Sequence, residues 1–83
     1  METRIPTTMN PDAIGKRLRE LRNATGKSAE TVAAEINKTG NVHIGAAAIS
    51  AYERGNRIPR DELKIALAHY FGVGVDELFF ASN

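Results

Sequence analysis

The sequence predicts an all-α fold, a compact arrangement of five short helices. Signals that start and stop helices recur at short spacing, and the apolar residues between them repeat at helical intervals. No segment shows a strand pattern of convincing length. Short helices must pack on one another to bury their apolar faces. A chain of 83 residues is long enough for one such domain with an economical core.

The first helix is expected to follow a segment without periodicity. Residues 1–9 are predicted to form a flexible N-terminal arm, and residues 10–83 the folded domain. Asn10 can cap the helix, Pro11 suits its first position, and Gly26 ends it. Its apolar face is expected to carry Ala13, Ile14, Leu18 and Leu21.

The second and third helices are bounded by equally clear signals. Ser28 can cap the second helix, and residues 37–41 have the composition of a turn. Gly45 can open the third helix, and Gly55 can end it. The residues predicted to point inward from these two helices are Val32, Ala33, Ile36, Ile49 and Tyr52.

The fourth helix is expected after Pro59, with Asp61 and Glu62 in its first turn and Gly72 at its end. Gly74 then caps a last helical turn. The predicted core residues of the fourth helix are Leu63, Leu67, Ala68 and Phe71, and the last turn contains Val75, Leu78, Phe79 and Phe80. Three pairs have the spacing of a hydrophobic staple, which strengthens the predicted boundaries: Met9 with Ile14, Ile44 with Ile49, and Val73 with Leu78.

Two adjacent phenylalanines, Phe79 and Phe80, close the predicted last turn. They cannot both point inward, because neighbouring residues are about 100° apart around a helix. One of them is therefore expected to be exposed and to offer a contact for a homodimer.

The composition argues against several classes of protein. Cysteine is absent, and the two histidines, His43 and His69, lack the spacing of metal ligands, so no metal and no cofactor are expected. No nucleophile is paired with a base and no phosphate-binding loop of the Walker type occurs, so the chain is not expected to be an enzyme. No apolar run approaches the about 20 residues of a membrane span, and a cytoplasmic location without membrane contact is expected.

The most informative stretch is residues 44–59, which predicts a short helix, a glycine stop and a basic loop that ends in proline. The net charge of the chain is only +1, but basic residues gather after this helix at Arg54, Arg57 and Arg60. A helix of this kind can enter a DNA groove while the basic loop contacts phosphates.

In this context the sequence resembles the Xre-type helix-turn-helix domain of phage repressors and Cro. Four stretches match in the family's order: residues 14–22, 28–36, 48–55 followed by Ile58 and Pro59, and 72–79. Gly74 stands where serine is usual in the family. The resemblance covers roughly 65 to 70 residues, which is the size of a small domain. It implies a five-helix, lambda-repressor-like fold that binds double-stranded DNA.

The resemblance also implies roles for individual residues. The third helix would enter the major groove, and four residues would face the bases: Ala46, Ala47, Ser50 and Ala51. Five residues would lie at the phosphate backbone: Ser28, Ala29, Arg54, Asn56 and Arg57. Arg22 and Glu53 match a pair that forms an internal ion bridge in the family and would fix the first helix against the third.

Two features depart from the family pattern. Residues 37–44 form a longer connection than the usual about 3–4 residues. This extended turn is either a loop on the outside of the motif or a segment from which Lys38, Asn41 or His43 reaches the DNA edge. Alanine occupies most base-facing positions and cannot make bidentate hydrogen bonds, so modest specificity that relies on backbone contacts and DNA shape is expected.

The sequence therefore favours a DNA-binding transcription regulator, repressor-like in action and dimeric on paired half-sites. The alternative is a protein-interaction or antitoxin-like module that retains the fold with weak DNA binding. An alanine-rich third helix favours that alternative, because small residues allow close helix packing; the protein partner would then be unknown.

Overall fold

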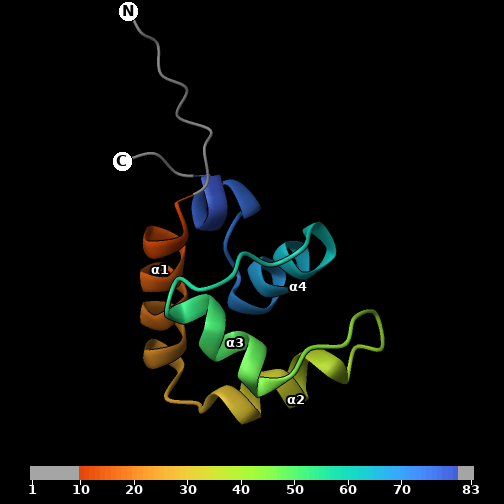
Figure 1. Ribbon diagram of the computed structural model, residues 1–83. Helices are drawn as coiled ribbons and strands as arrows, with labels where there is room; N and C mark the ends of the chain where they lie inside the picture. The colour runs from red at the N-terminus through yellow and green to blue at the C-terminus, as the bar shows by residue number, and fades with distance from the viewer. Residues whose placement is uncertain (1–9, 81–83) are drawn as a thin grey trace, which may run out of the picture.

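Five helical segments follow one another in the computed structural model, which describes residues 10–80 (Figure 1). They are α1 (Pro11–Thr25), α2 (Ala29–Asn37), α3 (Ala46–Glu53), α4 (Asp61–Phe71) and the short π-helical segment η1 (Asp76–Phe80). No strand occurs between residues 10 and 80. The predicted all-α fold is confirmed. The predicted arm, residues 1–9, and the Met9 staple partner lie outside the described residues.

The ends of the helices match the signals in the sequence. The Asn10 side chain accepts hydrogen bonds from the backbone N–H groups of Asp12 at 3.0 Å and Ala13 at 3.2 Å, and so caps α1. The Ser28 hydroxyl accepts from the N–H of Thr31 at 3.1 Å and caps α2. Each such cap stabilises a helix by about 1 kcal/mol. Local chemistry alone therefore fixes where the first two helices begin.

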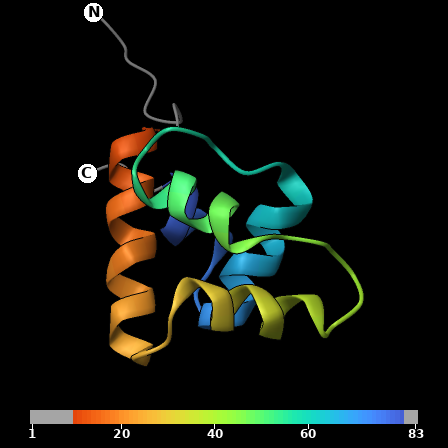
Figure 2. The same ribbon diagram turned by 60° about the horizontal axis from the view of Figure 1, so that its bottom comes forward.

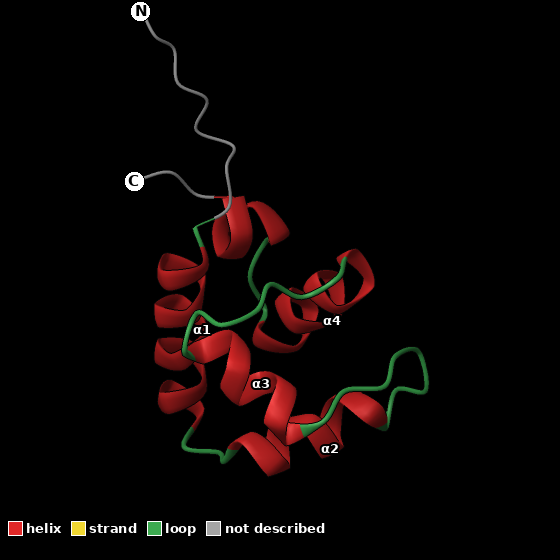
Figure 3. Cartoon of the chain, in the orientation of Figure 1, coloured by secondary structure: helices red, strands yellow, loops and turns green. Residues whose placement is uncertain are grey.

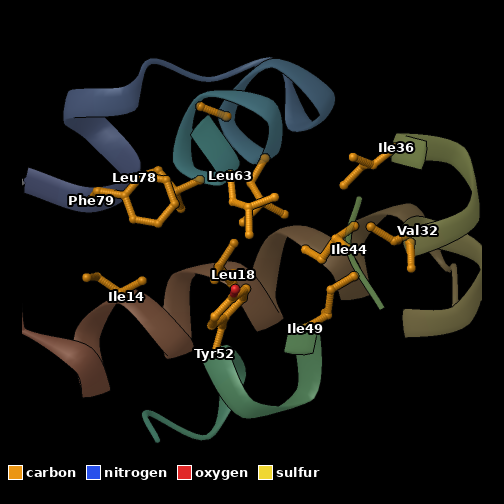
Figure 4. Packing of buried hydrophobic residues seen from close by; sticks show 13 residues of the cluster. Ile14, Leu18, Val32, Ile36, Ile44, Ile49, Tyr52, Leu63, Leu78 and Phe79 are labelled. Carbon is orange, nitrogen blue, oxygen red and sulfur yellow. The ribbon is translucent and has the colours of Figure 1, made fainter. Parts of the chain in front are cut away.

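All five segments contribute side chains to one core (Figure 4). Leu18 of α1, Tyr52 of α3 and Leu63 of α4 converge near its centre (Figure 4), and Leu78 and Phe79 of η1 close one end. Residues with a solvent exposure of 5% or less include Ile14, Leu18, Val32, Ala33, Ile36, Ile44, Ile49, Tyr52, Leu63, Leu67, Ala68, Leu78 and Phe79. This core seats α3 on its neighbours along one side and leaves the other side free.

The extended turn between α2 and α3 loops outward beyond the end of α2 (Figures 2 and 3), while Val42 within it packs against the core. Its two ends are held together by one side chain. The amide of Asn37 donates to the carbonyl oxygen of Ile44 at 2.7 Å and accepts from the N–H of Ile44 at 2.8 Å. The Ile44 side chain is buried in the core at 3% exposure. The additional residues are therefore an insertion closed at its base, which leaves the packing of α2 against α3 intact.

The C-terminal segment separates the two phenylalanines. Phe79 is 1% exposed and Phe80 is 37% exposed, which confirms that one points inward and the other outward. The side chain of Arg17 donates to the carbonyl oxygen of Leu78 at 2.9 Å and ties η1 to α1. The ring of Phe80 lies 5.5 Å from the ammonium of Lys64, within the range of a cation–π contact.

Candidate nucleic-acid interface

Helix α3 presents its N-terminal end to solvent. Ala47 is exposed, while Ala46 and Ser50 are half-buried, on the side away from Ile49 and Tyr52. Gly45 caps the helix without a side-chain hydrogen bond. The first N–H groups of a helix have no partner within the helix, so this end offers backbone donors and small side chains. Of the four residues expected to face bases, Ser50 carries the only hydroxyl.

Ala51, the remaining residue predicted to face bases, is largely covered by the protein itself. Its exposed fraction is 9%, and it belongs to the buried side of α3 together with Tyr52 and Glu53. An alanine methyl lies one bond from the backbone, so the longer neighbouring side chains shield it from solvent. The pattern of residues alone did not show this, because Ala51 lies on the boundary between the inner and outer sides of a short helix.

Three predicted phosphate contacts lie together just beyond α3. Gly55 adopts a left-handed conformation, with φ at 78°, and turns the chain there. Arg54, Asn56 and Arg57 around it are all exposed. The guanidinium carbon of Arg57 lies 5.9 Å from the centre of the Tyr52 ring. That contact with a buried side chain restrains Arg57 beside the helix.

The other predicted phosphate contacts lie at the start of α2. Ser28 is exposed and its hydroxyl already accepts from the Thr31 N–H, whereas Ala29 is half-buried and packs against the core. Neither side chain is charged, so the contribution of this end is the partial positive charge of the helix N-terminus.

An ion pair joins α1 to α3. Arg22 Nε lies 2.6 Å from Glu53 Oε2, and Arg22 Nη2 lies 2.9 Å from Glu53 Oε1, so the contact is bidentate. The Glu53 side chain is 6% exposed and that of Arg22 is 21% exposed. The hydrogen bond to Glu53 raises the pKa of Arg22, against the opposing effect of desolvation. The pair is the one implied by the resemblance, and it sets the position of the C-terminal end of α3.

Gly15 is a second link between α1 and α3, and the sequence analysis missed it. A Cβ at this position would lie 2.5 Å from the carbonyl oxygen of Glu53 and 2.6 Å from that of Tyr52. The two helix backbones therefore touch where Gly15 has no side chain. A glycine inside an apolar helical stripe, between Ile14 and Leu18, was the available signal for such a close approach.

The structure separates the three polar residues of the extended turn that were considered for DNA contact. Lys38 lies at the end of α2, where its charge acts on Glu35. Asn41 lines a hollow against α4. His43 lines a different hollow, together with Arg57 and Arg60. The turn thus lies partly on the outside of the motif and partly next to the basic loop.

Two further properties concern residues 10–80. No three His, Cys, Asp or Glu residues in this part of the chain are grouped so that they could hold a metal ion. None of its helices has the length and apolar character needed to cross a membrane.

The chain matches a known protein family and is similar to solved structures of other proteins. The family described as a helix-turn-helix domain matches residues 13–79. The restriction-modification controller protein C.AhdI from Aeromonas hydrophila is similar in structure, with a TM-score of 0.70 and 31% identity over 84% of this chain and 93% of that chain.

The DNA-binding domain of BldD is similar in two solved structures. The one from S. venezulae has a TM-score of 0.63 and 27% identity over 84% of this chain and 96% of that chain. The other has a TM-score of 0.62 and 27% identity over 84% of this chain and 93% of its own. No curated protein matches the sequence significantly. The residues matched by the family span parts of all five helical segments.

Proposed function

We propose a function from one premise: the chain belongs to the helix-turn-helix domain family, which it matches over residues 13–79. The protein is a DNA-binding transcription regulator. In our proposal α3 enters the major groove with its N-terminal end leading. One observation carries this: the exposed tip of α3 at Ala47 lies in the same segment as the exposed Arg54, Asn56 and Arg57. We propose that it acts in the cytoplasm and that it has no catalytic activity.

The base contacts that we propose are few and weak. The methyl groups of Ala46 and Ala47 can touch a thymine methyl, and the Ser50 hydroxyl can donate to or accept from a base edge. None can form the bidentate pairs that are worth about 1–3 kcal/mol of discrimination each. We therefore propose modest specificity, with much of it derived from DNA shape, and repression by occupying the site.

The phosphate contacts carry most of the affinity in this proposal. Arg54, Asn56 and Arg57 would contact one strand, and the backbone N–H groups at Ser28 and Ala29 would contact the other. Each arginine that neutralises a phosphate releases a counterion, so log K falls with log salt by about 0.9 for each such contact.

Replacing Arg54 or Arg57 with alanine is expected to lower the salt slope of DNA binding by about 0.9 for each residue and to weaken binding similarly on all sequences. Titration of a duplex panel at several salt concentrations measures both quantities. Lys16→Ala is the matched control, because it removes the same charge from an exposed position on α1. An equal loss of slope in Lys16→Ala would contradict the proposed interface, and discrimination of many thousandfold between duplexes would contradict modest specificity.

One observation favours a second function. The outer side of α3 carries alanines and a single hydroxyl, a surface that suits close packing against another protein helix. This is the protein-interaction or antitoxin-like alternative. A wild-type protein whose DNA binding is weak and almost independent of salt would favour it over the regulator.

We propose that the regulator acts as a homodimer on half-sites about one helical turn, ~34 Å, apart. Phe79 cannot supply the contact, because it is 1% exposed, whereas Phe80 is 37% exposed.

Phe80→Ser is expected to weaken the dimer about tenfold or more, as loss of an aromatic anchor does. Sedimentation equilibrium measures this, with Ile58→Ser as the control because Ile58 is also 37% exposed. A wild-type protein that stays monomeric at high concentration, with and without DNA, would exclude the proposal.

A further inference from the structure

A hollow of about 250 Å³ lies between the extended turn and the segment that links α3 to α4. The turn contributes His43 and Ile44, the linking segment contributes Arg57 and Arg60, and Gly45 at the start of α3 lies between them in the sequence. Ala48 and Tyr52 of α3 also line it. The hollow is thus formed by the segments that precede and follow α3, along the side of the helix that carries Ala48 and Tyr52.

The ionisable side chains that line this hollow are basic, apart from the phenol of Tyr52. One of these basic side chains has an acidic partner: the Glu62 carboxylate lies 3.7 Å from Arg60 Nη2, with both side chains more than 60% exposed. Such an exposed pair is worth little and leaves Arg60 free to turn to another anion. Arg57 is restrained by its contact with the Tyr52 ring. The hollow therefore offers three nitrogen-bearing side chains to a negatively charged group.

We propose that this hollow binds one phosphate of the DNA backbone, and that His43 contacts it together with Arg57 and Arg60. The inference rests on the proposed function, since α3 must lie in the groove for a phosphate to pass here. It adds His43 and Arg60 to the interface. It also gives the extended turn a role: the insertion brings a histidine to a phosphate that the basic loop already faces.

The position of His43 distinguishes it from the other polar residues of the turn. The Asn37 amide holds Ile44 at 2.7 and 2.8 Å, one residue from His43, so the backbone at this point is anchored. Lys38 lies at the other end of the turn, where α2 ends, and does not line the hollow. A contact that depended only on net charge would favour Lys38, whereas a contact in the hollow requires His43.

Histidine makes this contact depend on pH. The protonated ring adds a positive charge and a second N–H donor, and histidine side chains change charge between about pH 5 and 8. The titratable side chains that line the hollow together with His43 are Arg57, Arg60 and Tyr52, and Glu62 pairs with Arg60. Because the protonated form is the one that binds phosphate better, DNA affinity should rise as pH falls.

The test measures binding of the full chain to a short mixed-sequence duplex at about pH 6 and about pH 8, at constant ionic strength. Wild-type protein and His43→Gln are compared with His69→Gln, the matched control, since His69 is also exposed but lies on α4 at a different hollow. Wild type and His69→Gln are expected to bind about threefold to tenfold more tightly at the lower pH. His43→Gln is expected to lose this increase in affinity, and its salt slope at the lower pH should be smaller than that of the wild type by up to about 0.9.

Arg60→Ala provides a second variant and is expected to weaken binding at both pH values. Circular dichroism of all variants checks that they are folded. The inference is overturned if His43→Gln keeps the same pH dependence as His69→Gln while the wild type binds DNA. A wild-type protein that binds no duplex at either pH contradicts the proposed function itself, and the inference with it.

Discussion

Alanine at position 15 is expected to destabilise the protein by about 2 kcal/mol or more, although alanine is the better helix former. The helix preference favours alanine over glycine by about 1 kcal/mol. Against it, the added Cβ would lie 2.5 and 2.6 Å from two carbonyl oxygens of α3, and 2.9 Å from a carbonyl carbon. These are backbone atoms in a packed helix, so they cannot rotate aside, and α1 and α3 must separate. The steric cost of the added Cβ therefore exceeds the gain from the higher helix preference of alanine.

Denaturant unfolding of Gly15→Ala and wild type measures this difference through the midpoint of the transition. Gly45→Ala is the matched control: the same carbon is added where no heavy atom lies within 4 Å, and its φ of −106° suits any residue. The control should change stability by less than about 1 kcal/mol. Unchanged or increased stability of Gly15→Ala would show that the two backbones do not touch in solution. Because α3 takes its position from α1, weaker DNA binding of the folded variant is also expected.

Arg22→Ala is expected to cost about 2–4 kcal/mol, the second large effect. Among residues 10–80, the Glu53 carboxylate, which is 6% exposed, then keeps one ion-pair contact, with Arg19 Nε at 4.0 Å. Removing one partner of a fully buried pair costs about 3–5 kcal/mol. The loss expected for Arg22→Ala is smaller than for a fully buried pair, because the Arg22 side chain is 21% exposed and water can partly replace its guanidinium. For a small domain of marginal stability, this loss unfolds a substantial fraction of the protein near physiological temperature.

Arg19→Ala is the control for this prediction. Arg19 approaches the same carboxylate, but its side chain is 55% exposed, so a loss below about 1 kcal/mol is expected. The double variant Arg22→Ala with Glu53→Gln should recover part of the stability, because no buried charge then remains without a partner. Equal losses in Arg22→Ala and Arg19→Ala, measured by denaturant unfolding, would show that the pair does not hold α1 to α3.

Sequence reasoning succeeded where the cause is local. Asn10 and Ser28 cap their helices through hydrogen bonds to N–H groups two or three residues away, and Gly55 ends α3 with a positive φ. The separation of Phe79 from Phe80 follows from helical geometry. The order and type of the elements could therefore be predicted before any contact between them was known.

The same reasoning reached its limit at the interface between segments. It treated Ala51 as base-facing, although the packing of α3 buries it, and it left three residues of the extended turn equally able to reach DNA. It missed Gly15 as the point where two helix backbones meet. The burial of Ala51, the reach of the turn residues and the contact at Gly15 all depend on the rotation of one helix about its axis or on the path of a loop. Residues far away in the sequence set both.

By itself, the sequence determined where the helices begin and end, most of the residues that form the core, and that a basic loop follows the third helix. Only the tertiary structure decided that Gly15 and the Arg22–Glu53 pair fix α3 to α1, and that His43 rather than Lys38 or Asn41 lines the same hollow as Arg57. The physical reason is the range of the interactions. Caps and turns depend on atoms a few residues apart, whereas these contacts join segments about ten to forty residues apart, whose distance is known only once the core has packed.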